Sequence, residues 1–351
     1  MKGHIVVPIL VIACLAAPAL SDSRLPVPIK INGRPARLDI DTGTERTCLF
    51  DAGARRLGLQ VTPPDPNIKA APGRVVAGRT EECTLEIGDS SARGRLSVVT
   101  LPSYLKPGTD GVMGWDLLGE KIIEMDGPGR TLRIRDHRTF DVSPWQCWTI
   151  RPNARVLIVQ IPAEPGEPNG VLIDTGTPGG VDLNPQRWRR WIDAHPDQPA
   201  TLDASYTPGI GLLVTQERWT PELTLGGQTL REVPVSNRSA IGQTAVGDDY
   251  AATLGLFALL RLSIVVDGTC GKAYVKSHPR PEGPNRYEYN RLGAVFVPAN
   301  LQSSDLVAHV VEGSPAYEAG VRNDDVLLRI DDLDATKWRT DPRVLPLSRF
   351  W

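Results

Sequence analysis

The tetrapeptide Asp-Thr-Gly-Thr stands at residues 41–44 and again at residues 174–177. Each copy follows a short apolar run typical of a strand, residues 36–40 before the first and 170–173 before the second. Two carboxyl groups at matching strand ends are what a hydrolase with paired aspartates needs. Such carboxyls cannot both ionise easily within hydrogen-bond reach, so they share one proton, and one can act as base toward water while the other acts as acid.

A second signature distinguishes a repeat from two ordinary strand-ending turns. It follows each tetrapeptide by about 70 to 80 residues and reads GVMGWDLL at residues 111–118 and ATLGLFAL at residues 252–259. An apolar strand ending in Asp comes after each signature, at residues 122–126 and 264–267. The two halves therefore carry the same motifs in the same order.

The spacing between the motifs supports a repeat as well. Asp41 and Asp174 are 133 residues apart, and Gly114 and Gly255 are 141 residues apart. A shared order of motifs with so small a drift predicts a domain duplicated within one chain.

On these motifs, residues 24–278 resemble the pepsin and retropepsin-like aspartic proteases. The resemblance rests on Asp-Thr-Gly after an apolar strand and on the turns at residues 112–114 and 253–255. It implies two pseudo-symmetric acid-protease β-barrel lobes, a peptide or protein substrate, and a monomer, since both halves lie in one chain. Thr253 departs from the family pattern, because it takes an apolar position of the second turn.

The resemblance also assigns roles to the motif residues. Asp41 and Asp174 are the expected catalytic pair, which would flank the attacking water. The residues expected to support the pair, by pinning the strands, approaching the carboxylates, donating hydroxyls or forming the turns, are Thr42, Gly43, Thr44, Thr175, Gly176, Thr177, Gly114 and Gly255.

The hairpin that would cover the substrate is not decided by the sequence. Pepsins carry a tyrosine in the flap of the first half, but the corresponding stretch here, residues 71–78, has none. The second half offers an aromatic hairpin at residues 206–209. Either hairpin could serve as the flap.

Composition excludes several other functions. The chain has 351 residues, a net charge of −2 and no basic run, so a nucleic-acid partner is not expected. Its 31 prolines and 33 glycines, with many short alternating runs, favour a mainly β fold. The signatures of serine hydrolases, zinc peptidases and P-loop proteins do not occur, and the five histidines are scattered, so no metal and no cofactor are expected.

The N-terminus indicates export to the periplasm or the extracellular space. Lys2 precedes an apolar run over residues 5–17 that is too short to span a bilayer, and Ala17-Pro18-Ala19 offers a cleavage site. A competing interpretation takes residues 11–14 as a lipoprotein signal with Cys14 as the lipid-bearing residue.

Four further cysteines suggest two disulfides in an exported protein, with three connectivities open. One pair in each half is the simplest arrangement, Cys48 with Cys83 and Cys147 with Cys270. The alternative is four buried free thiols.

The C-terminal segment resembles a PDZ domain. Residues 312–321 read EGSPAYEAGV, followed by a strand that starts Asp-Val-Leu. Leu292, Gly293 and Ala294 lie in the loop that the resemblance assigns to the carboxylate of a bound peptide, which implies a C-terminal peptide as ligand. The chain stops where a PDZ domain normally has one more strand. A purely structural appendage is the alternative.

These motifs divide the chain into five parts. We expect a signal peptide over 1–20, a first lobe over 24–140, a second lobe over 141–278, a linker over 279–287 and a PDZ-like domain over 288–351. Within the second lobe, Pro185 in a first turn and Trp188, Trp191 and Ile192 on one face predict a helix over 184–193. The expected function is an exported aspartic endopeptidase. Its rivals are a non-catalytic two-lobed peptide-binding protein and half-sites that act only as a dimer across chains.

Overall fold

The computed structural model describes residues 26–63, 75–87, 90–100, 108–136, 141–207, 211–237, 250–278, 287, 289–300 and 303–341. The expected signal peptide over residues 1–20 lies outside the described residues, with Cys14 in it. Most of the expected linker over 279–287 and the C-terminal residues 342–351 lie outside them too. No helix in the described ranges is long and apolar enough to cross a membrane.

The chain forms two compact units. The larger comprises Ser21–Pro196 and Trp219–Tyr287, and the smaller includes Asp197–Arg218 and Glu288–Trp351. Both tetrapeptides belong to the larger unit. Residues 197–218, which the sequence placed with the second lobe, group instead with the PDZ-like segment.

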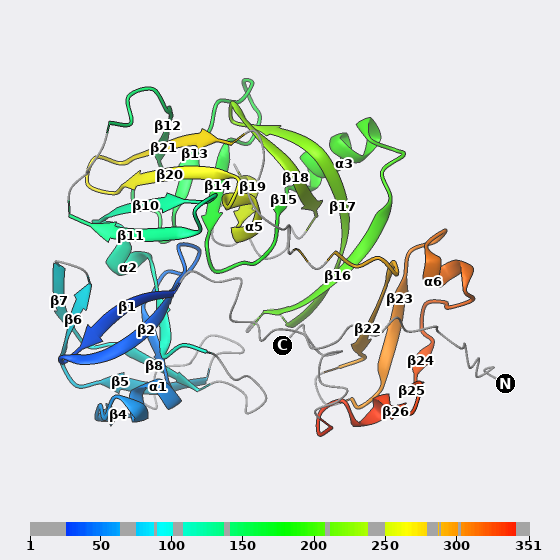
Figure 1. Cartoon of the computed structure of the whole chain (residues 1–351), viewed down its shortest axis with the longest axis horizontal. Coiled ribbons are helices and arrows are strands. Elements are labelled where there is room, and N and C mark those ends of the chain that lie inside the picture. Colours follow the sequence, from blue (N-terminus) through cyan, green and yellow to red (C-terminus); the bar gives the residue numbers. More distant parts are fainter. Residues whose placement is uncertain are drawn as a thin grey trace. The chain divides into compact units, whose positions relative to one another are not determined.

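The first half of the larger unit is built almost entirely from short strands (Figure 1). Its elements are β1 (Pro26–Ile31), β2 (Arg34–Ile40), β3 (Cys48–Phe50), α1 (Asp51–Arg56), β4 (Val61–Thr62), β5 (Val75–Thr80), β6 (Cys83–Ile87), β7 (Ser90–Gly94), β8 (Ser97–Thr100), β9 (Gly111–Met113), α2 (Trp115–Leu118), β10 (Ile122–Asp126) and β11 (Thr131–Arg135).

The hairpin of β1 and β2 shows how the sequence sets this architecture. Asn32 and Gly33 form its two-residue turn, and both have positive φ angles, 51° and 74°. Two successive positive φ angles give the turn that suits the twist of paired strands, and Asn-Gly is the preferred pair for it. Strand β2 then buries Leu38 and Ile40 on the way to Asp41.

The second half of the chain supplies the other strands of the larger unit. Its elements, including β17, whose residues are divided between the two units, are β12 (Gln146–Ile150), β13 (Ile158–Gln160), β14 (Gly170–Asp174), β15 (Val181–Leu183), α3 (Pro185–Ala194), β17 (Gly211–Leu225), β18 (Gln228–Ser236), β19 (Tyr250–Gly255), α5 (Leu256–Leu259), β20 (Leu262–Asp267) and β21 (Lys272–Ser277).

The two halves place their strands in the same order around the two tetrapeptides. In the first half the order is β2-β9-β3-β8, and in the second half it is β14-β19-β15-β18. The directions agree as well: β2 and β14 run parallel to β9 and β19, and β3 and β15 run antiparallel to those strands.

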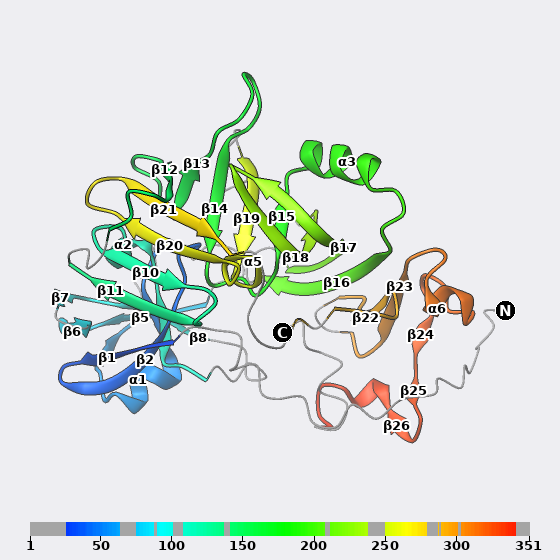
Figure 2. The same cartoon turned by 45° about the horizontal axis from the view of Figure 1, so that its top comes forward.

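One pair of strands joins the halves directly. The apolar strands that follow the two second signatures, β10 and β20, pair antiparallel, with Ile123 opposite Val266 and Met125 opposite Ile264. Figure 2 shows these strands side by side. A single hydrophobic cluster containing Leu38, Met113, Ile173 and Leu254 runs through both halves, so the strands before and behind the tetrapeptides share one core.

Helix α3 occupies the position that the sequence predicts. It spans Pro185–Ala194, and the side chain of Asn184 caps it by accepting a hydrogen bond from the Arg187 N–H at 2.7 Å. Trp188 and Trp191 are buried in the core cluster and stack with ring centroids 5.6 Å apart. Their role is therefore packing.

The smaller unit contains the PDZ-like segment and part of the second half. Besides the first residues of β17, its elements are β16 (Ala200–Thr207), β22 (Ala294–Pro298), β23 (Leu306–Val310), α6 (Pro315–Glu318), β24 (Val326–Leu327), β25 (Arg329–Ile330), β26 (Leu333–Asp334) and the 3-10 helix η2 (Ala335–Lys337).

An apolar contact explains why residues 197–218 group with the PDZ-like segment. Val295 and Val297 of β22 are buried against a hairpin that β16 forms with β17. The hairpin contributes Leu202, Ala204, Leu212 and Val214 to this cluster. Asn290 strengthens the contact, because its side-chain amide donates to the Leu202 carbonyl at 2.9 Å.

The expected disulfides are not formed, since all four cysteines are thiols. Cys48 and Cys83 lie on β3 and β6, which β9, β2 and β1 separate in the sheet. Cys147 lies opposite Tyr274, four residues beyond Cys270. Cys270 itself lies in the turn between β20 and β21, so the two cysteines are not opposite each other. The alternative of four buried thiols does not hold either, because Cys147 and Cys270 are exposed.

Candidate active site

Asp41 and Asp174 take equivalent positions at the ends of two central strands. Asp41 follows β2, and its N–H donates to the carbonyl of Met113 on β9 at 3.0 Å. Asp174 ends β14 and lies opposite Gly255 at the end of β19. Both aspartates are half-buried. Pairing with the neighbouring parallel strand therefore fixes the backbone position of each aspartate.

The glycines of the second signatures allow the chain to turn closely behind each aspartate. A Cβ on Gly114 would lie 2.6 Å from the backbone of Arg46, and a Cβ on Gly255 would lie 2.4 Å from the carbonyl oxygen of Gly179. Gly114 precedes helix α2, and Gly255 precedes helix α5. A side chain at either position would push apart the two loops that form this region.

Thr42 and Thr175 tie the two halves together through a reciprocal set of hydrogen bonds. The Thr42 hydroxyl donates to the carbonyl of Ile173 at 2.5 Å, and the Thr175 hydroxyl donates to the carbonyl of Ile40 at 2.7 Å. Each threonine N–H also donates to the hydroxyl oxygen of the other threonine, at 3.1 and 3.2 Å. Both residues are buried, so the network holds the two strand ends in register.

Gly43 and Gly176 bring each carboxyl group against the opposite half. A Cβ on Gly43 would lie 2.4 Å from the carboxyl carbon of Asp174, and a Cβ on Gly176 would lie 2.3 Å from that of Asp41. Each aspartate side chain is thus seated on the glycine of the other tetrapeptide. Together with the threonine network, this seating gathers both carboxyl groups into one site.

Each carboxyl group accepts hydrogen bonds from its own loop. Asp41 accepts the N–H of Gly43 at 3.0 Å. Asp174 accepts the N–H groups of Gly176 at 2.9 Å and of Thr177 at 3.1 Å, and its other oxygen accepts the Thr177 hydroxyl at 3.0 Å. Thr44 donates its N–H to the backbone carbonyl of Asp41 at 3.3 Å. The threonine after the glycine therefore reaches the carboxyl group in the second half.

The surroundings of Asp174 favour its protonated form. Burial is the largest influence and raises the pKa of this carboxyl, and the negative charge of Asp182 raises it further. The hydrogen bonds from Thr177 and Gly176 act in the opposite direction, but the pKa of Asp174 remains above its ordinary value. A carboxyl that keeps its proton can serve as an acid beside an ionised partner.

Asp182 is the residue near the site that sequence reasoning missed. It is buried in β15, and the only signal in the sequence is a charged residue between Val181 and Leu183. Its backbone carbonyl accepts the hydroxyl of Tyr250 at 3.1 Å.

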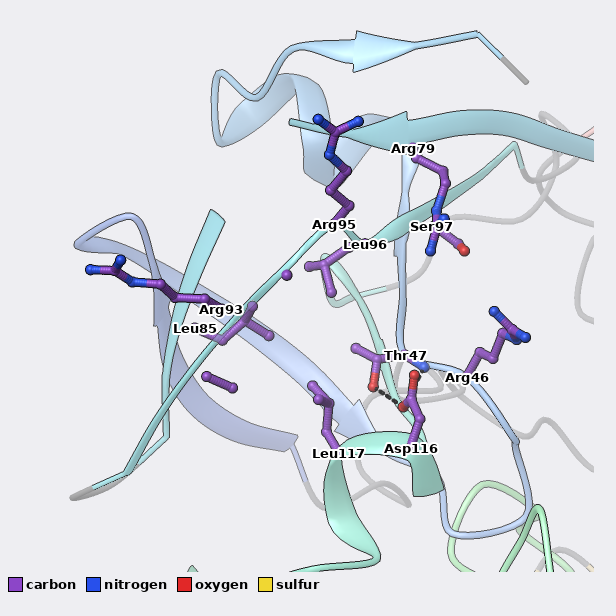
Figure 3. Close-up of a pocket in the computed structure, with 12 residues that line it drawn as sticks. Arg46, Thr47, Arg79, Leu85, Arg93, Arg95, Leu96, Ser97, Asp116 and Leu117 are labelled. Carbon is purple, nitrogen blue, oxygen red and sulfur yellow. Dashed lines mark hydrogen bonds between the residues drawn. The ribbon is translucent and has the colours of Figure 1, made fainter. Parts of the chain in front are cut away.

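A cavity of about 100 Å³ lies in the first half (Figure 3). Leu85, Leu96 and Leu117 line it together with Thr47 and Asp116, whose carboxylate accepts the Thr47 hydroxyl at 2.7 Å. Arginines stand at its rim, and in Figure 3 the side chains of Arg93 and Arg95 extend away from it. Neither Asp41 nor Asp174 lines this cavity.

Within the described ranges, no group of three or more His, Cys, Asp or Glu side chains could hold a metal ion.

The residues proposed for the flap are only partly described. In the first half, residues 64–74 lie outside the described ranges, and β5 begins at Val75. In the second half, residues 208–210 lie outside them, while β16 and β17 pair up to Thr207 and Gly211. The choice between the two hairpins stays a prediction.

The loop assigned to peptide binding lies at the start of β22. Gly293 has a positive φ of 67°, Leu292 is 49% exposed, and Ala294 begins the strand. The Leu292 N–H donates to the side chain of Asn290 at 3.0 Å. Backbone contacts fix the loop, because the carbonyl of Gly293 accepts the N–H of Val311 at 2.9 Å.

Comparison with known proteins bears on the fold of the first half of the chain. Residues 27–120 match the family model described as gag-polyprotein putative aspartyl protease, which supports a retropepsin-like aspartic protease fold for this region. The retroviral protease-like domain of Ddi1 from Leishmania major is a similar solved structure, with 18% identity, a TM-score of 0.22 and coverage of 27% of this chain and 74% of that chain. No curated protein sequence matches the chain.

Proposed function

We propose that this chain is an aspartic endopeptidase whose two halves arose by duplication and meet at Asp41 and Asp174. The observation that carries the proposal is the reciprocal seating of each carboxyl group on the glycine of the opposite tetrapeptide. A binding protein has no need for two carboxyl groups held together in this way, whereas a paired-aspartate hydrolase depends on it. The family match over residues 27–120 supports the same reaction class.

In the proposed reaction a water molecule attacks the carbonyl carbon of a peptide bond. The ionised carboxylate of Asp41 takes a proton from this water, and the protonated carboxyl of Asp174 gives its proton to the carbonyl oxygen. As the carbon–nitrogen bond of the tetrahedral species breaks, Asp41 gives the proton that it took from the water to the nitrogen, and a hydroxyl of the tetrahedral species returns a proton to Asp174. The products are a carboxylic acid and an amine. The hydrogen bonds to Asp174 fix its orientation throughout.

The substrate class follows from the same geometry. A carboxyl pair that spans both halves suits an extended peptide that crosses both tetrapeptides. We propose that the C-terminal part of the chain adds a second peptide contact, in which a peptide C-terminus binds as a strand beside β22. The exposed Leu292 and the left-handed backbone at Gly293 support this role. The apolar N-terminal run supports export, with ordinary secretion ahead of a lipid anchor at Cys14.

A mixed peptide library tests the function. The protein is incubated with the library from about pH 3 to pH 8, with and without a pepstatin-type inhibitor, and new termini are identified by mass spectrometry. We expect inhibitor-sensitive cleavage on the acid side of neutral. Peptide binding without cleavage at any pH would favour the non-catalytic alternative, and activity that rises with the square of protein concentration would favour a site shared between chains.

A further inference from the structure

A third carboxyl group lies in the second half of the site. Asp182 belongs to β15 and is 7% exposed. Burying a carboxyl group is costly unless hydrogen bonds compensate it. The hydroxyl of Ser236 donates to Oδ1 of Asp182 and provides such a bond. The mechanism above does not use Asp182.

Strand register places Asp182 on the same face of the sheet as Asp174. The order of the strands is β14-β19-β15. Asp174 lies opposite Gly255, and Asp182 lies opposite Thr253, two residues earlier on the same strand. Residues two apart on a strand share a face, so all four share one. Two strand spacings and two residues of rise put the Cα atoms of Asp174 and Asp182 about 12 Å apart.

Buried hydroxyl groups lie on the strands around Asp182. The hydroxyl of Tyr250 contacts Oγ1 of Thr253 at 3.2 Å, and both side chains are buried. Burial raises the pKa of the Tyr250 phenol, so this group stays neutral. Because Asp182 is buried, its charge is screened less than a charge in water would be.

The first half carries no carboxyl group at the corresponding place. Asp182 lies opposite Ser236 on β18 and Thr253 on β19. In the same register of the first half, Cys48 lies opposite Ser97 on β8 and Val112 on β9. The counterpart of Asp182 is therefore the thiol of Cys48. The second half therefore has a buried carboxyl group where the first half has a thiol, while the first half has a buried carboxyl group of its own at Asp39 of β2, two residues before Asp41.

The titratable and polar groups that face Asp174 come from three elements. Its own loop provides the hydroxyl and N–H of Thr177 and the N–H of Gly176, all of which stabilise the ionised form. The opposite tetrapeptide provides Asp41, a like charge when it is ionised. Strand β15 provides Asp182, whose negative charge raises the pKa of Asp174.

We propose that Asp182 is a positioning residue that acts through Asp174 by holding the shared proton of the aspartate pair on Asp174. Its charge therefore decides which aspartate has which role: Asp174 is the acid and Asp41 is the base. This inference deepens the proposed peptidase function and depends on it. The role needs a negative charge at residue 182, which separates it from a purely structural role.

The central test is the pH profile of kcat/KM for Asp182→Asn. The variant keeps the size of the side chain and an oxygen that accepts from Ser236, but it removes the charge. Loss of a like charge lets the shared proton leave at lower pH, so the basic limb of the profile moves toward acid. At a separation of about 12 Å and an effective dielectric constant of about 20, the expected movement is about one pH unit.

Two matched variants separate charge from structure. Asp182→Glu keeps the charge, so its basic limb should stay within about 0.3 pH units of the wild-type limb if charge is what matters. Cys48→Asp adds a carboxyl group at the corresponding register of the first half. It should move the basic limb toward higher pH, because the pair then faces a further like charge.

A readout without turnover distinguishes this inference from the peptidase function. Carbon-13 NMR follows the titration of the Asp174 carboxyl, whose signal is identified by its loss in Asp174→Asn. The midpoint should fall by about one pH unit in Asp182→Asn, whether or not any peptide is cleaved. A profile and a midpoint that both match wild type would overturn the inference. If Asp182→Asn does not fold, an unmoved basic limb in Cys48→Asp would overturn it.

Discussion

Gly43 leaves no room for a side chain beside Asp174, since a Cβ at this position would lie 2.4 Å from the Asp174 carboxyl carbon. Gly176 stands in the same relationship to Asp41, at 2.3 Å. Close approach of backbone to a carboxyl group requires glycine. The two glycines therefore couple the halves at the site itself.

Substitution of either glycine by alanine should disable the site. In Gly43→Ala the Asp174 carboxyl must move by about 1 Å to restore ordinary contact, and displacement of reacting groups on that scale lowers rates by about 100-fold. Steady-state kinetics on a cleaved peptide measures the loss in kcat. The control is Gly94→Ala, where a Cβ would meet nothing within 4 Å. Equal activity of the two variants would contradict the close contact between Gly43 and the Asp174 carboxyl.

The threonine network should contribute to stability as well as to geometry. Thr42→Val removes the hydroxyl that donates to Ile173 and leaves that buried carbonyl without it, which should cost about 1–3 kcal/mol in the free energy of unfolding. Urea denaturation measures this loss. Thr42→Ser should restore most of it, and the exposed Thr131→Val serves as control.

The same network predicts coupling between the two halves. Thr42 and Thr175 exchange hydrogen bonds. The double variant with valine at both positions should therefore lose less free energy of unfolding than the two single variants lose in sum. Strict additivity would show that the two threonines act independently.

Much of this part of the chain is predictable from the sequence, because it depends on the backbone requirements of short segments. A tetrapeptide after an apolar strand, a glycine at each second turn and the Asn-Gly hairpin at residues 32–33 all follow from backbone requirements that only a few residues meet. Helix α3 is readable for the same reason, since Asn184 and Pro185 mark its start.

The features that the sequence did not predict depend on contacts between distant residues. The grouping of residues 197–218 with the PDZ-like segment comes from Val295 and Val297 packing on a hairpin about 90 residues earlier. The separation of Cys48 from Cys83 follows from the three strands that lie between β3 and β6 in the sheet. Asp182 stands out only once strand register puts it on the face of Asp174.

The cysteines should react as thiols at different rates. In a protein that begins at residue 21, the exposed Cys147 and Cys270 should be alkylated first and the buried Cys83 last. Burial raises the pKa of the Cys83 thiol, which lowers its reactive thiolate fraction. Mass spectrometry over time gives the order. Fewer than four alkylated cysteines in denatured, unreduced protein would indicate disulfides and contradict the structure.

Asp110 should make the stability of the first half depend on pH in the acid range. Burial alone would raise the pKa of Asp110, but hydrogen bonds from the Arg56 side chain and the Arg37 N–H, with the Arg56 charge, lower it below its ordinary value. A lowered pKa in the folded state stabilises the protein above the unfolded-state pKa, and this stabilisation is lost as pH falls through the folded-state pKa.

The corresponding measurement compares Asp110→Asn with wild type. The variant should lower Tm clearly at pH 7, and the difference should shrink as pH falls below about 4, where the unfolded carboxyl takes up its proton. A control is Asp51→Asn, which removes a half-buried carboxylate paired with the exposed Arg55 on the same helix. A Tm difference for Asp110→Asn that does not depend on pH would show that its charge is not involved.

The measurement that tests the paired site most directly is the kcat/KM of Asp41→Asn and Asp174→Asn, each assayed on the same peptide as wild type with folding checked by circular dichroism. Acid and base are both needed in the same step, so each variant should lose about 100- to 10,000-fold in activity while keeping the wild-type fold. If either folded variant retained turnover close to wild type, the two aspartates would not form the catalytic pair.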